Sequence, residues 1–193
     1  MSLSQRSQTF ITCVIISLVS HLGCSDEEGQ TPSDMIPNNS GSTLAEGEQR
    51  YLIPFVASVN ELPLNCGTEY DGVGIARSTI EVRDFRFYLY DVHLINAEGE
   101  SVSLRLDEGN GFQLRYPKAD GTQGGLALID FTDTASEICA DRGTAEINTL
   151  ISGIAQEGDY QKITFTLGVP SELNHVNSAV SQAPLNTYGM QWT

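Results

Sequence analysis

The sequence predicts an all-β fold, an antiparallel β-sandwich or a partly open barrel with long loops. Short alternating or continuous apolar stretches recur along the chain, and turn-forming residues separate them. No stretch sustains the period of a helix, and no segment repeats another. Short strands in succession favour antiparallel pairing in two layers. With 193 residues and 40% hydrophobic content, we expect a single domain behind an N-terminal extension.

Residues 1–23 are typical of an export signal, and residues 24–49 of a disordered acidic and polar tether. Arg6 precedes an apolar run that is too short to span a bilayer. Leu22, Gly23 and Cys24 match the end of a bacterial lipobox, which predicts a lipid anchor on Cys24. Ordinary secretion is the alternative. We therefore expect the protein in the cell envelope, lipid-anchored in the outer membrane or periplasmic.

Six strands are predicted in the domain, which we expect to span residues 50–193. They lie at residues 51–57, 79–95, 102–106, 126–131, 148–154 and 160–167. Pro54 confines the first strand to a sheet edge or a bulge, because proline has no N–H to donate. Phe85, Phe87 and Leu89 share one face of the second strand, and residues 96–99 turn it into the third as a hairpin.

The remaining segments predict turns. Residues 107–125 are rich in Gly, Asp and Asn, but their acids do not alternate as in a calcium-binding EF-hand, so a plain turn is favoured. Residues 156–159 predict a hairpin turn between the last two strands. A helix is tolerable only as a short one within residues 171–181, or just before Cys139.

Four cysteines sort by position. Cys13 leaves with the signal, and Cys24 takes the lipid. Cys66 and Cys139 remain as an even pair in an oxidising compartment, which predicts one disulfide. A thiolate metal site is the alternative, but the two residues lack the close spacing of a thiolate cluster.

The polar segment at residues 168–192 predicts a loop that presents functional groups. It contains His175, Met190 and the single tryptophan, Trp192. Imidazole and thioether groups are ligands that copper favours. A hydrogen-bonded structural role for His175 is the alternative.

Several motifs, in order, resemble the MbnP-like family, the methanobactin-associated copper-binding proteins also called four-Cys metallo-mystery pair proteins. They are LNCGTEYDGVG at 64–74, RDFRFYLYDVHLI at 83–95, ALIDF at 127–131, YQKITFTLGVP at 160–170, GVPSELNH at 168–175 and MQW at 190–192. The resemblance covers about residues 51–193. Two departures stand out: only two cysteines fall in the domain, and the chain ends at Thr193, before the family's second tryptophan and closing strand. We therefore expect the domain to be truncated at its C-terminus.

The resemblance implies a copper site. His175 lies in the matching LNH, and His93 joins it as a candidate ligand, since it ends the Phe85 face if that strand stays regular. A satisfied histidine at a strand end is the alternative for His93. The resemblance further implies that a diheme peroxidase-like partner oxidises Trp192 to kynurenine, whereas a tryptophan that completes a core is the alternative.

No catalytic motif emerges, so we expect no enzyme. Twenty-five acids against ten bases give a formal charge of −15, which disfavours nucleic acid as a partner. The predicted function is that of an exported protein that binds or stores copper. The alternative is a non-catalytic interaction or adhesion module of the cell surface.

Overall fold

The computed structural model describes residues 44–134, 137, 139 and 145–190. Its regular elements there are strands, apart from the three-residue 3-10 turn η2 (Ser178–Val180). The strands are β1 (Glu48–Pro54), β2 (Ser58–Val59), β3 (Leu62–Pro63), β4 (Glu69–Val73), β5 (Ser78–Glu81), β6 (Arg86–Asn96), β7 (Ser101–Ser103), β8 (Arg105–Leu106), β9 (Gln113–Pro117), β10 (Gln123–Asp130), β11 (Leu150–Gln156) and β12 (Tyr160–Leu167). The all-β prediction is confirmed. Within this part of the chain no helix is long and apolar enough to cross a membrane.

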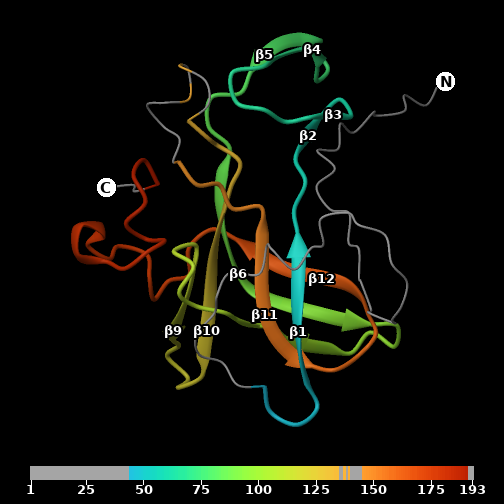
Figure 1. The fold of residues 1–193 in the computed structure, drawn as a ribbon, viewed down its shortest axis with the longest axis vertical. Helices are drawn as coiled ribbons and strands as arrows, with labels where there is room; N and C mark the ends of the chain where they lie inside the picture. The colour runs from blue at the N-terminus through green and yellow to red at the C-terminus, as the bar shows by residue number, and fades with distance from the viewer. Residues whose placement is uncertain (1–43, 135–136, 138, 140–144, 191–193) are drawn as a thin grey trace, which may run out of the picture.

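Two antiparallel sheets form a sandwich (Figure 1). One has the strand order β1-β11-β8, and the other the order β12-β6-β10-β9, with β7 beside the far half of β6. The chain crosses from the second sheet to the first between β7 and β8, which only Leu104 separates. Neither sheet closes into a barrel, and the arrangement is consistent with the predicted β-sandwich.

The main core lies between the sheets. It gathers buried side chains from both, among them Ile53, Leu89, Ile129, Ile151 and Tyr160. Such burial of apolar surface is the dominant stabilising term for a sandwich of this kind. Gln113 adds a buried polar link: its side chain donates to the carbonyls of Asp107 and Ser152 and accepts the Ser152 N–H, each at 2.9 Å. The link joins β9 to β11 across the two sheets.

A second apolar cluster lies on the other face of the five-stranded sheet. Its buried members are Tyr88, Leu114, Tyr116, Leu126 and Leu128. Residues of the C-terminal segment pack against it, so both faces of this sheet are covered. This explains why residues 126–129 of β10 form a continuous apolar run, within five consecutive buried residues from 126 to 130.

Most of the strand predictions are confirmed, although their bounds shift. β1 is an edge strand, as Pro54 requires, and β6 and β7 form the expected hairpin. The predicted strand at residues 79–95 is split, because the chain leaves β5 and restarts in β6. The predicted hairpin at residues 156–159 is wrong: β11 pairs with β1 and β8, whereas β12 pairs with β6. That turn crosses between the sheets instead.

Three further pairings each include at least one strand that was not predicted. β9 lies inside the stretch predicted as a plain turn and pairs with β10, which begins there and continues into the predicted strand. β2 pairs with β3, and β4 with β5, around Cys66. The last two hairpins form a unit that we call the head, residues 57–85, which lies beyond the ends of the two main sheets (Figure 1).

A bulge in β6 decides which way its second half faces. Asp91 has a φ of 56°, and the partner register slips by one residue there, since Thr164 and Thr166 of β12 oppose His93 and Tyr90. Leu89 faces the main core before the bulge, and Val92 and Leu94 face it afterwards. Because side chains alternate along a strand, His93 falls on the opposite face. The prediction that His93 continues the Phe85 face is therefore wrong, since the strand is not regular.

Candidate functional site

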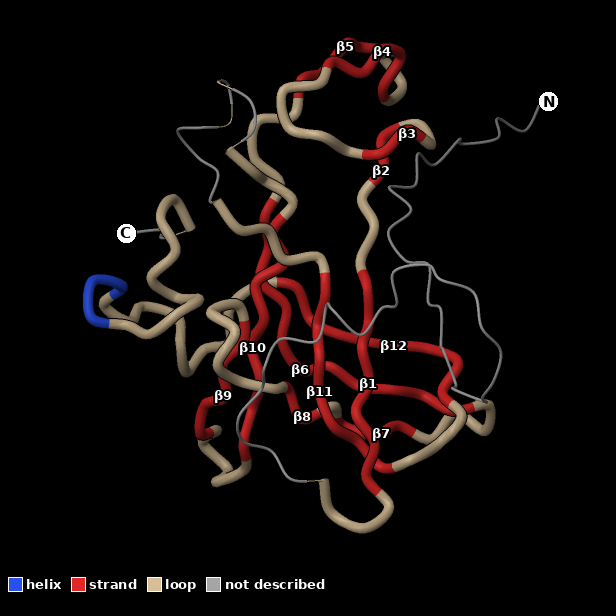
Figure 2. The backbone as a smooth tube through the Cα atoms, viewed as in Figure 1, coloured by secondary structure: helices blue, strands red, loops and turns tan. Residues whose placement is uncertain are grey.

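The C-terminal segment, residues 168–190, is fastened across the outer face of the five-stranded sheet. The Gly168 N–H donates to the carbonyl of Tyr88 at 2.9 Å. The Tyr88 hydroxyl in turn donates to the carbonyl of Pro184 at 2.7 Å. Arg86, two residues earlier on β6, donates to the carbonyl of Tyr188 at 3.0 Å. Two neighbouring side chains of one strand thus hold a loop that has little secondary structure of its own (Figure 2).

The same segment also packs. Val169, Leu173, Leu185 and Met190 lie against the second apolar cluster, and Pro184 is fully buried. The segment was predicted to present functional groups, and its packing against the sheet was not predicted. The thioether-bearing side chain of Met190 contributes to this packing.

His175 lies where the first turn of the segment ends. The carbonyl of Pro170 accepts the N–H groups of Leu173 and Asn174, at 3.0 and 2.9 Å, which closes one helical turn. His175 follows with a φ of 77°, the left-handed conformation that commonly ends a helical turn. The residue is exposed, and its imidazole makes no hydrogen bond to any residue the structure describes.

His93 is half-buried on the outer face of β6. Its Nδ1 lies 3.2 Å from the hydroxyl of Ser101, and its Nε2 lies 3.8 Å from a carboxylate oxygen of Asp91. The second distance is too long for a hydrogen bond. Metal-binding histidines typically have one ring nitrogen hydrogen-bonded to a neighbouring group, which leaves the other nitrogen to bind the metal. His93 fits this pattern, with Nδ1 next to a hydroxyl and no hydrogen bond at Nε2.

Charged groups connect the surroundings of the two histidines. Lys118 donates to Asp91 at 2.9 Å, and this hydrogen bond lowers the pKa of Asp91 and raises that of Lys118. The pKa of Glu172 is also lowered, first by its own backbone N–H and then by the Ser171 hydroxyl, with smaller effects from the Ala119 N–H and the charge of Lys118. The turn that ends at His175 therefore approaches the Lys118 end of β9.

The described residues do not complete a metal site. Among them, no group of three or more His, Cys, Asp or Glu side chains is placed to hold an ion. Trp192, the predicted kynurenine precursor, lies outside the described residues, as do Cys24, the export signal and most of the tether. His175 and His93 lie on the same face of the sheet, but among the described residues they do not belong to a common group of three or more possible metal ligands.

Cys66 and Cys139 form the disulfide that was predicted for them as the even pair in the domain. Their Cα atoms lie 6.1 Å apart, 73 residues apart in sequence. Cys139 is fully buried. The bond joins the head to the segment that follows β10.

Sequence reasoning missed Arg86 and Tyr88, the residues that position the segment. The signal was present: the second face of the strand carries Arg86, Tyr88 and Tyr90, and two aromatic residues in alternation indicate a face that is covered. The side chain of Arg86 is fully buried and pairs with Asp84 through two hydrogen bonds of 2.8 and 2.6 Å, which raise its pKa.

Comparisons with known proteins agree with the fold. A family model for MbnP matches residues 48–193. The solved structure of MbnP from Methylosinus trichosporium is similar to this chain at 23% sequence identity, with a TM-score of 0.56. The similarity covers 75% of this chain and 50% of that one, so this chain spans about half the length of that protein. No curated protein matches the sequence.

Proposed function

Since the chain belongs to the MbnP family, whose model covers residues 48–193, we propose that it is an exported protein that binds or stores copper. It turns over no substrate in this proposal. The lipid on Cys24 would hold it at the outer membrane, and the tether would separate the domain from the bilayer. Copper is the cargo of the protein.

The observation that carries the proposal is the setting of His175. Its imidazole is exposed and has no hydrogen-bond partner among the described residues, in a segment fastened to β6 by Arg86 and Tyr88. Because the segment is already fastened, its backbone loses little conformational freedom when the imidazole ligates an ion, and no hydrogen bond to a described residue has to be broken first. Neutral imidazole is a preferred copper ligand.

His93 is proposed as an accessory ligand through Nε2. The hydroxyl of Ser101 would hold its Nδ1, which fixes the ring orientation. The acidic surface of the protein, with its formal charge of −15, favours cation capture over anion capture. Trp192 is proposed as the substrate of a diheme peroxidase-like partner, which would convert its indole to kynurenine and so supply an aryl amine as a further ligand.

Copper retention tests the proposal. Full-length protein is incubated with copper, with and without ascorbate to supply both oxidation states, then desalted and measured by elemental mass spectrometry. We expect about one copper per chain, and a loss of affinity of roughly tenfold or more in His175→Ala. Asn174→Ala is the matched control, because it alters the adjacent exposed residue without removing an imidazole. Absence of retained copper, or equal retention by His175→Ala, contradicts the proposal.

A surface interaction module remains the second candidate function. Val180 is 81% exposed and Tyr188 76% exposed, both in the C-terminal segment. Exposed apolar side chains on a held loop are typical of a contact surface. Copper retention that is unchanged by His175→Ala and His93→Ala together favours this candidate.

A further inference from the structure

The head contains a pocket, open to solvent on one side, that the copper proposal does not use; we call it the head cavity. Its volume is about 740 Å³, and it lies between the β2–β3 turn, the β4–β5 hairpin and the strand end at residues 81–85. Pockets that bind small organic ligands occupy about 300–1,000 Å³. The cavity is therefore of the right size for one such molecule.

The wall includes six apolar side chains, of which five pack in neither core cluster; the sixth, Phe85, contacts Phe87 and Phe131 beside the main core. All six are half-buried: Val59, Leu64, Val73, Ile80, Val82 and Phe85. Six apolar residues around one space would gain by burial against an apolar guest, at about 25 cal/mol per Å² removed from water.

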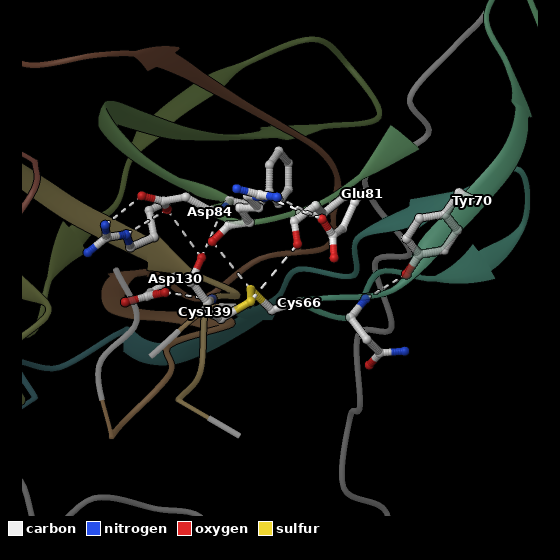
Figure 3. Close-up of a disulfide and its surroundings, with 12 residues drawn as sticks. Cys66, Tyr70, Glu81, Asp84, Asp130 and Cys139 are labelled. Carbon is white, nitrogen blue, oxygen red and sulfur yellow. Dashed lines mark hydrogen bonds and ion pairs between the residues drawn. A yellow bond between two sulfur atoms is a disulfide. The ribbon is translucent and has the colours of Figure 1, made fainter. Parts of the chain in front are cut away.

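The walls are also held in place without a ligand. Tyr70, 2% exposed, accepts the N–H of Asn65 and donates to the carbonyl of Pro63, both at 2.7 Å. Asn60 donates to the carbonyl of Asp71 at 3.0 Å, which joins the two hairpins. The disulfide anchors the base of the head beside Glu81 and Asp84 (Figure 3). The cavity is thus preformed, which lowers the entropy cost of binding.

The carboxylates that line the cavity differ in whether they have an ion-pair partner. Glu81 accepts two hydrogen bonds from Arg83, and Asp84 is paired with Arg86. Glu61, on the β2–β3 turn, is the lining carboxylate that has no ion-pair partner among the described residues. One negative charge therefore remains uncompensated beside an apolar cavity.

We propose that the head cavity binds a small apolar molecule that carries one positive charge, such as a primary amine on an aromatic or aliphatic body. The apolar part fills the space among Val59, Ile80 and Phe85, and the ammonium group lies near Glu61. The site is separate from His175 and His93 and does not depend on copper.

The probe is 1-naphthylmethylammonium, titrated into the 15N-labelled full-length protein and followed by amide chemical shifts and by calorimetry. We expect saturable amide shifts confined to the head. Relative to the ammonium ligand, binding should be about threefold weaker for the neutral analogue 1-naphthylmethanol, and weaker again for the 1-naphthoate anion. Glu61→Gln should bring the ammonium and the alcohol to similar affinity.

Two substitutions that fill or spare the cavity complete the test. Ile80→Trp should reduce binding about tenfold or more by occupying the space, with Val59→Trp as a second filling variant if the first does not fold. Ile75→Trp is the matched control, because Ile75 is 92% exposed and does not line the cavity. No saturation up to about 5 mM, shifts outside the head, or equal binding by the filled variants overturns the proposal. Equal affinity for the ammonium and the carboxylate overturns its charge preference.

Discussion

Tyr88 joins the sheet to the C-terminal segment through a buried phenol. The residue is 6% exposed, and burial raises its pKa to about 12, although the charge of Arg86 opposes this increase. In the unfolded chain the phenol ionises near pH 10. Between pH 10 and 12 the unfolded state has lost this proton and the folded state has kept it. The stabilisation is therefore complete below pH 10 and is lost as the pH rises through 12.

We predict that Tyr88→Phe flattens this dependence. Above pH 10 the free energy of unfolding of the wild type should fall by up to roughly 2 kcal/mol more than that of the variant. The variant lacks the phenol whose pKa differs between the folded and unfolded states. At pH 7 the variant should be less stable by about 1 kcal/mol, since the hydrogen bond to Pro184 is lost. Urea unfolding at pH 7, 9, 10.5 and 11.5 measures both effects. Tyr188→Phe, at an exposed position, is the control. Parallel curves for wild type and Tyr88→Phe above pH 10 would contradict the assignment.

The bulge at Asp91 is the element-scale feature that sets the faces of β6. A φ of 56° is uncommon for non-glycine residues and strained for β-branched ones. We predict that Asp91→Val lowers the free energy of unfolding by about 2 kcal/mol. Asp91→Gly should change it by less than about 0.5 kcal/mol, because relief of strain offsets the lost, half-exposed ion pair with Lys118.

Denaturant unfolding of both variants, beside Lys118→Met, separates strain from charge. Lys118→Met removes the ion pair and leaves the backbone at Asp91 unchanged. Equal losses in Asp91→Val, Asp91→Gly and Lys118→Met would mean that the ion pair, and not the backbone conformation, matters at this position.

Local pattern predicted the strands better than their partners. β10 and β12 were recognisable because their apolar residues are continuous or alternate, and a turn bounds each of them. The residues of β9 are few and lie among Gly, Asp and Asn, so their burial depends on contacts with β10 that no local pattern contains. The turn at residues 156–159 shows the same limit: its composition indicates a reversal, but Tyr51, over a hundred residues away, binds the carbonyls of Gln156 and Gly158 and fixes its path between the sheets.

The candidate site was also only partly predictable from the sequence. His175 stood out because a polar loop and a motif both contained it. The orientation of His93 was not accessible, since one extra residue in a strand exchanges its two faces.

At the scale of the whole molecule, the disulfide ties the head to the sandwich. It closes 73 residues, so the chain-entropy estimate of its contribution is about 4 kcal/mol. We predict that the double variant Cys66→Ser, Cys139→Ser is destabilised by up to that amount. Its amides in β4 and β5 should exchange with solvent faster than those in β10. Hydrogen exchange by mass spectrometry measures this difference, with the wild-type oxidised protein as the reference. A double variant that matches the wild type in both stability and exchange would show that the head is held without the bond.

The fastening of the C-terminal segment also has a kinetic consequence. The bonds from Tyr88 and Arg86 span 96 and 102 residues of sequence, and neither acceptor has a place to dock until β6 is paired on both edges. During refolding, His175 should thus reach its native surroundings only after the sheet has assembled. A partly folded chain would carry this imidazole on an unfastened segment, so capture of an ion before folding is complete would be disfavoured.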